Sequence, residues 1–216
     1  MKYSHVIFDL DGTLCDPGLG ITESVAYSLN KLGIVETDPK KLRKFVGPPL
    51  QHSFKEFYDM DDKTTEEAIR IYRERFKNKG IFEYKLYAGM EKLLSQLKHY
   101  KITLSVATSK IEPFALQILS SQNILDYFSF ISADEPGKPK LKTQTIRSVL
   151  NNFNKTNRSN FIMVGDKEHD IIGANENGID SIGVLYGYGT KEDLVNHHAK
   201  YIAKDVSNLS KILLGS

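Results

Sequence analysis

The chain has 216 residues and a formal net charge of +2 at pH 7, with basic and acidic residues interspersed along it. Such a weak and even charge argues against a nucleic-acid-binding protein. The single cysteine, Cys15, excludes an internal disulfide and a cysteine-based zinc site, and no apolar run approaches the length of a membrane span.

The most informative stretch is Val6–Leu14, which reads VIFDLDGTL. Its first three residues are β-branched or aromatic and predict a short buried strand. Asp9 and Asp11 follow, and we expect both side chains on one side because strand side chains alternate with a period of two. Two carboxylates this close repel each other unless a cation joins them, so the stretch predicts a site for a hard cation such as Mg²⁺. An ordinary acidic loop after a strand is the alternative.

The following segment, residues 16–84, has the periodicity of helices and no clear strand. Four helices are expected, over residues 21–32, 40–45, 50–58 and 64–80. The last would open with a capping box formed by Thr64 and Glu67. A crossover between parallel strands needs only about a dozen residues. The segment between the first two predicted strands is far longer than that, which predicts a separate helical domain inserted after the first strand.

From residue 85 on, predicted helices and strands alternate. The strands are expected over residues 102–107, 128–131, 161–164 and 179–184, and the helices around residues 90–97, 115–119, 146–153, 171–174, 191–197 and 205–214. Continuously apolar strands are typical of a parallel sheet covered by helices on both faces. We therefore predict an α/β protein, with a doubly wound parallel sheet over residues 1–15 and 85–216 and a helical domain over residues 16–84.

Polar residues follow two more predicted strands at their carboxyl ends, where such sheets bind ligands. Thr108 and Ser109 come after the second strand, and a hydroxyl beside exposed backbone N–H groups suits a phosphate oxygen. Asp166 lies just after the strand over residues 161–164, and Asp170 lies one helical turn later on the same face. The simpler alternatives are a strand-ending turn and, for Asp170, a charge favoured by the helix dipole.

These stretches, in this order, resemble the motifs of the haloacid dehalogenase superfamily of aspartate-nucleophile hydrolases, and the resemblance extends over residues 3–205. Two further stretches, residues 45–50 (FVGPPL) and residues 187–189 (GYG), resemble the phosphoglycolate-phosphatase-like branch, which has a helical cap. The resemblance places Gly47 in a cap loop that faces the substrate and affects specificity. A plain helix–helix connection explains residues 47–49 almost as well.

The same resemblance implies a lysine at or just before a helix start. The stretch over residues 137–142 offers three lysines. The helical phase of Ile146, Val149 and Leu150 selects Lys142, and Lys138, which precedes a proline, is the alternative.

The resemblance also implies the chemical roles. Asp9 is the nucleophile and Asp11 the acid and base. Mg²⁺ is held by Asp9, the backbone carbonyl of Asp11, and Asp166. Phosphate is bound by Thr108, Ser109 and Lys142, and Asp170 supports this set, either through water or by orienting Lys142.

We therefore expect a Mg²⁺-dependent phosphatase that hydrolyses a small phosphomonoester through an aspartyl-phosphate, with phosphoglycolate as the first candidate. A 5'-nucleotidase, a sugar-phosphate phosphatase and a phosphomutase are the alternatives, and the intact carboxylates and lysine argue against a non-catalytic binding protein. The expected partner is a small phosphorylated metabolite, without nucleic acid or membrane. The first residues lack a signal-peptide core, so we expect a cytoplasmic protein, either monomer or homodimer.

Overall fold

The computed structural model describes residues 2–136 and 140–215. The chain divides into two compact units, the larger built from residues 1–16 and 86–216 and the smaller from residues 17–85. Two short strands, β2 (Cys15–Asp16) and β3 (Lys85–Leu86), pair with each other where the chain passes from one unit to the other. That the smaller unit caps the larger one stays a prediction.

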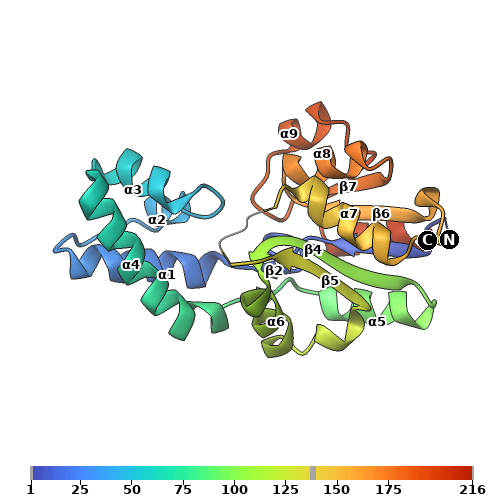
Figure 1. Cartoon of the computed structure of the whole chain (residues 1–216), viewed down its shortest axis with the longest axis horizontal. Helices are drawn as coiled ribbons and strands as arrows, with labels where there is room; N and C mark the ends of the chain where they lie inside the picture. Colours follow the sequence, from blue (N-terminus) through green and yellow to red (C-terminus); the bar gives the residue numbers. More distant parts are fainter. Residues whose placement is uncertain (1, 137–139, 216) are drawn as a thin grey trace. The chain divides into compact units, whose positions relative to one another are not determined.

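A parallel sheet forms the centre of the larger unit (Figure 1). Its order is β5-β4-β1-β6-β7-β8, and each neighbouring pair is parallel. The strands are β1 (His5–Phe8), β4 (Thr103–Ile111), β5 (Phe130–Asp134), β6 (Phe161–Gly165), β7 (Asp180–Val184) and β8 (Tyr201–Ala203). The predicted α/β class and doubly wound parallel sheet are confirmed.

Helices cover both faces of this sheet. They are α5 (Met90–His99), α6 (Glu112–Ser121), α7 (Lys142–Asn152), α8 (Glu168–Glu176), α9 (Lys191–Asn196) and α10 (Val206–Leu214). Figure 1 shows α7 and α8 on one face and α5 and α6 on the other. Within the described residues, no helix has both the length and the apolar character needed to span a membrane.

The central strand β1 is buried on both of its faces. Ile7 packs into a cluster with Met163 of β6 and with Ile146 of α7, while Val6 and Phe8 are equally inaccessible. Burying such side chains stabilises the fold by roughly 1.5–3 kcal/mol each. The residue after Phe8 is therefore attached to one of the most firmly held parts of the chain.

The smaller unit is helical. It contains α1 (Gly18–Lys31), α2 (Pro39–Arg43), α3 (Leu50–Tyr58), α4 (Asp62–Asn78) and a short 3₁₀ helix over Gly80–Phe82. Helix α1 packs along α4, where the Ser28 hydroxyl donates to the carbonyl of Ala68 at 2.6 Å. The aromatic rings of Phe45 and Phe54 meet edge to face and fill the space beside α3.

The start of α4 differs from the prediction. The helix begins at Asp62, and its N-cap is Asp61, whose carboxylate accepts a hydrogen bond from the Thr64 N–H at 2.7 Å. Glu67 does not complete a capping box with Thr64 but pairs with Arg70. Aspartate and threonine are both good N-caps, so composition alone does not choose between them.

The strands also differ in detail. Strand β4 continues to Ile111, with a register shift between Ala107 and Ile111 where it pairs with β5. Strand β5 begins at Phe130 because a 3₁₀ helix over Leu125–Tyr127 precedes it. Strand β8 was not predicted, because its three residues are too few to show a pattern.

Candidate active site

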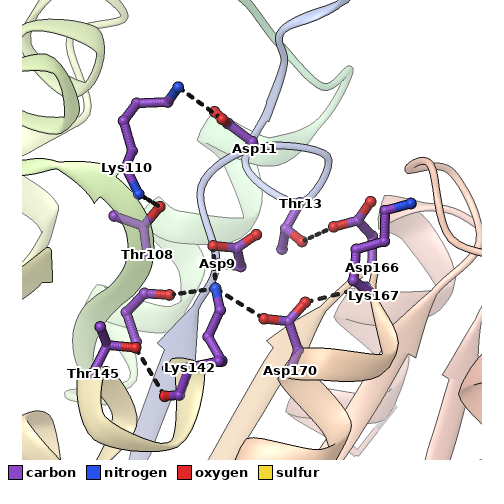
Figure 2. A network of polar contacts seen from close by, with 11 residues as sticks. Asp9, Asp11, Thr13, Thr108, Lys110, Lys142, Thr145, Asp166, Lys167 and Asp170 are labelled. Atoms are coloured by element: carbon purple, nitrogen blue, oxygen red, sulfur yellow. Dashed lines mark hydrogen bonds and ion pairs between the residues drawn. The ribbon is translucent and has the colours of Figure 1, made fainter. Parts of the chain in front are cut away.

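Three strands bring the predicted polar residues to one edge of the sheet (Figure 2). Strand β1 lies between β4 and β6, and all three are parallel, so their carboxyl ends meet there. Asp9 directly follows β1, and its backbone N–H donates to the carbonyl of Val164 in β6 at 2.9 Å. This bond continues the sheet by one residue and fixes the backbone of Asp9, whose side chain is 10% exposed.

Lys142 is the first residue of α7, and its ammonium group lies between two carboxylates. The Nζ atom is 2.7 Å from Asp9 Oδ1 and 3.0 Å from Asp170 Oδ1, and it also donates to the carbonyl of Ala107 at 3.1 Å. Burial alone would lower the pKa of Lys142, but the carboxylates of Asp170 and Asp9 outweigh it and raise the pKa. Lys142 therefore remains a cation beside Asp9. The alternative, Lys138, lies outside the described residues.

Asp166 follows β6 and is almost fully buried. Its Oδ2 accepts a hydrogen bond from the Tyr188 N–H at 2.8 Å, and the Thr13 hydroxyl approaches Oδ1 at 3.4 Å. Burial, together with the charges of Asp9 and Asp170, raises the pKa of Asp166 to about 7. A nearby cation would stabilise the ionised form of a carboxyl group in this setting.

Asp170 lies in the first turn of α8 and is buried as deeply as Asp166. Its Oδ2 accepts from the Lys167 N–H at 3.1 Å, which closes the start of the helix. Burial raises the pKa of Asp170 to about 6, although the Lys142 charge works in the opposite direction. Of the two supporting roles expected for Asp170, this geometry matches orientation of the Lys142 ammonium.

Gly12 allows the turn after β1 to approach Asp166. Its φ angle is +82°, and a Cβ atom there would lie 2.3 Å from Asp166 Oδ2. Any other residue would be both strained and in collision with this carboxylate. The glycine of the Asp-Gly-Thr sequence is therefore needed for packing at the site.

Asp11 lies apart from the other carboxylates and has its own cation. Its Oδ2 is 2.9 Å from Lys110 Nζ, and its side chain is 34% exposed. Lys110 lies near the end of β4, where its backbone N–H donates to the Thr108 hydroxyl at 3.2 Å. Strand β1 ends at Phe8, so the period-two argument does not extend to Asp11, and Figure 2 shows the two aspartates directed to different lysines.

The sequence analysis did not identify Lys110, Thr13 or Tyr188 as site residues. Lys110 had one usable signal, because it follows Thr108 by two residues and so shares its face of the strand. Thr108 itself is buried, and Ser109 is exposed. Gly47 belongs to the smaller unit, between α2 and α3, so its role in specificity stays a prediction.

The buried carboxylates of Asp9, Asp166 and Asp170 could hold a metal ion. Within the described part of the chain they form a group in which one oxygen of each lies within 4.8 Å of the others. A set of carboxylate oxygens suits a hard divalent cation. Lys142 can offset only one negative charge of this set, so the set fits a divalent cation. The side chain of Asp11 is not in this group, which leaves its expected backbone carbonyl as a prediction.

Comparison with known proteins agrees with this geometry. The model of the haloacid dehalogenase-like hydrolase family matches residues 6–184. The chain belongs to this family. A solved structure from Clostridium difficile, provisionally named a phosphatase, has a TM-score of 0.95 and 46% identity to this family member, and the match covers 99% of both chains.

Curated relatives carry names of different enzymes. A protein named 5'-nucleotidase from Pseudomonas aeruginosa is 38% identical over 99% of this chain and 96% of its own length. A protein named tyrosine-protein kinase PtkA from Mycobacterium tuberculosis is 32% identical over 96% of this chain and 70% of its own. A protein named phosphoglycolate phosphatase from Neisseria meningitidis is 30% identical over 85% of this chain and 81% of its own length. The predicted family and its phosphoglycolate-phosphatase-like character are thus confirmed.

Replacement of Lys142 by alanine should strongly reduce catalysis. The change removes the ammonium group beside Asp9 and leaves Asp170 without its ion pair. We expect kcat/KM to fall by about 100-fold or more. Lys140→Ala is the matched control, since that side chain pairs with Glu135. Lys138→Ala tests the alternative, and a larger loss for Lys138→Ala than for Lys142→Ala would contradict the assignment.

The metal-free protein should lose stability as the pH rises. Asp166 has an ordinary pKa of 3.8 and a folded-state pKa of about 7. Its stabilising contribution is therefore complete below the ordinary pKa and is lost as the pH rises through about 7. In chelator, the unfolding free energy should fall by on the order of 2 kcal/mol between about pH 5.5 and about pH 8.

Thermal unfolding with and without Mg²⁺ measures this effect. Mg²⁺ should raise the melting temperature more at the higher pH, where the carboxylates carry more charge. Asp166→Asn removes the titrating group and should flatten the pH dependence in chelator. An Asp166→Asn variant with the wild-type pH profile would show that other groups are responsible.

Proposed function

We propose that this chain is a Mg²⁺-dependent phosphatase that transfers the phosphoryl group of a small phosphomonoester to Asp9 and then to water. The observation that carries the proposal is the Asp9 carboxylate, fixed at the end of β1 beside the Lys142 ammonium group and two further buried carboxylates. Family membership and relatives named as phosphatases support a phosphoric monoester hydrolase. The tight packing around Asp9 favours a nucleophile of fixed position.

In the first step, a carboxylate oxygen of Asp9 forms a bond to phosphorus. The bond between phosphorus and the leaving oxygen breaks, and Asp11 gives that oxygen a proton. In the second step, Asp11 takes a proton from water, which attacks the aspartyl-phosphate and releases phosphate and free Asp9. The separate contacts of Asp9 and Asp11 support these separate roles.

Side chains at the edge of the sheet would bind the phosphoryl oxygens. The Thr108 hydroxyl accepts from Lys110 N–H, so its own proton remains available for a phosphate oxygen. Lys142 stays charged and supplies a cation next to the nucleophile. The Ser109 backbone is the third predicted donor. Together they would stabilise the charge that develops on the equatorial oxygens.

Asp9 and Asp166 are the proposed side-chain ligands of Mg²⁺, with the Asp11 carbonyl as a third ligand and Asp170 behind Lys142. When bound, the ion offsets the repulsion between an anionic nucleophile and an anionic phosphate. The all-oxygen donor set and the raised pKa of Asp166 support this cofactor.

A nucleoside 5'-monophosphate and phosphoglycolate are the two proposed substrates. The relative named 5'-nucleotidase is 38% identical to this chain and favours the nucleotide. The relative named phosphoglycolate phosphatase is 30% identical and supports the other candidate, which was our first expectation from the sequence. Transfer to a hydroxyl group instead of water is the second candidate function, because one relative is named a kinase.

A phosphate-release screen tests the proposed function. Purified protein with Mg²⁺ should release phosphate from nucleoside monophosphates, phosphoglycolate, sugar phosphates and an aryl phosphate, and ranking by kcat/KM would identify the substrate. Chelator should abolish release, and Mg²⁺ should restore it. Full activity after metal removal would contradict the proposed cofactor. Release of less phosphate than ester consumed would indicate transfer to another acceptor.

Asp9→Asn is the sharpest variant for this screen. The change is nearly isosteric and removes the nucleophile, so turnover should fall below detection while the protein remains folded. Asp126→Asn, at an exposed position of the same unit, is the matched control and should keep wild-type activity. Wild-type kcat in the Asp9 variant would show that another residue attacks phosphorus.

Substrate choice should depend on the loop over residues 47–50. Gly47 has a φ angle of +114°, so a side chain there is strained and Gly47→Leu can fail for that reason alone. Leu50→Ala, at the first position of α3, avoids this strain. It should change the ranking of natural phosphate esters by about 10-fold while changing kcat/KM for a small aryl phosphate by less than about threefold. An unchanged ranking in folded Gly47 and Leu50 variants would place specificity elsewhere.

A further inference from the structure

We propose that Lys110 is a positioning residue for Asp11. The ammonium group of Lys110 determines which Asp11 oxygen carries the proton that is given to the leaving group. The inference rests on the proposed function, because it takes Asp11 as the acid of a phosphatase reaction. Its basis is the ion pair of 2.9 Å between Lys110 Nζ and Asp11 Oδ2, visible in Figure 2. No motif identified in the sequence gives Lys110 a role.

The Asp11 side chain as a whole is more open than the other carboxylates at this edge, although its Oδ1 atom is buried. Its side chain is 34% exposed, whereas those of Asp9 and Asp170 are 10% and 1% exposed. It also lies beyond the end of β1, in the turn that leads to Gly12. An ion pair to Oδ2 helps to fix the orientation of this carboxyl group, and small errors in orientation are costly in proton transfer.

Lys110 is better held than the group it contacts. Its side chain is 14% exposed, it belongs to β4, and its backbone N–H is bonded to the Thr108 hydroxyl. Strand β4 runs parallel to β1 with Phe8 opposite Val106, so the two strands reach the edge of the sheet at the same level. The extension of β4 beyond the predicted end brings Lys110 to the level of Asp11.

The ion pair has a direct consequence for the first chemical step. While an Asp9 oxygen bonds to phosphorus, the electron pair of the breaking bond moves to the leaving oxygen, which takes the Asp11 proton. Because Oδ2 accepts from Lys110, the proton is carried by Oδ1. A rotation that turned this proton away would break the ion pair. Without Lys110 the acid remains present but loses this constraint on its orientation.

Dependence on the leaving group distinguishes this role from a structural one. An alkoxide leaving group needs the proton, whereas 4-nitrophenolate leaves without it. For Lys110→Met, kcat/KM should fall on the order of 10-fold to 100-fold with an alkyl phosphate and by less than about threefold with 4-nitrophenyl phosphate. kcat/KM is the right quantity because it covers the steps up to the aspartyl-phosphate and not its hydrolysis.

Three further variants complete the test. Lys110→Arg keeps a cationic donor and should recover most of the alkyl phosphate activity, and Lys110→Gln provides a second neutral variant should the methionine variant not fold. In an Asp11→Asn background, Lys110→Met should cause no further loss, since residues that act as a unit are not additive. Lys98→Met, at an exposed position of α5, is the matched control.

Two results would overturn the inference while leaving the proposed function in place. One is an equal loss for all leaving groups in the neutral variants, and the other is an additive loss in the Asp11→Asn background. A wild-type protein that released phosphate from no ester would instead overturn the proposed function itself. The two failures therefore have different signatures.

Discussion

Buried negative charge at the edge of the sheet is the constraint on which this structure depends. Asp9, Asp166 and Asp170 bring carboxylate oxygens within 4.8 Å of one another, in surroundings that water hardly reaches. Lys142 offsets part of the repulsion through its contacts with two of them. Burial first, and then the charge that Lys142 does not offset, raise the pKa values of Asp166 and Asp170. Uncompensated buried charge lowers the free energy of unfolding, and a bound cation raises it again.

The rest of the larger unit supplies the rigidity that this arrangement needs. Asp9 is attached to a strand buried on both faces, and backbone N–H groups of Lys167 and Tyr188 hold the carboxylates of Asp170 and Asp166. Backbone donors do not rotate as side chains do. They therefore keep like charges close together where free side chains would move apart.

Much of the fold could be predicted from the sequence, because buried parallel strands appear as continuous apolar runs and carry the polar residues at their ends. The parts that could not be predicted depended on contacts between distant segments. Strand β4 continues to Ile111 because it pairs there with Asp134 of β5, although Thr108 and Ser109 suggest a turn. Strand β8 is defined by its pairing with β7 and not by its own three residues.

The candidate site shows the same division. Asp9, Lys142, Asp166 and Asp170 were selected from the sequence, and the structure brings them together, although their roles stay predictions. The partner of Asp11 was not selected. It depends on the length of β4, which in turn depends on pairing with a strand far along the chain. Local patterns carry information about which residue types are present but not about which distant side chain each one meets.

The separation of Asp9 from Asp11 fits the two roles proposed for them. A nucleophile must present an unprotonated oxygen to phosphorus, while the acid must present a proton to the leaving group on another side of the same small substrate. Two carboxyl groups one residue apart would share one environment if a single cation lay between them. Here each has its own lysine, Lys142 from the start of α7 and Lys110 from the end of β4. The two lysines come from different elements, a helix and a strand, so the two aspartates of one short motif have distinct electrostatic settings.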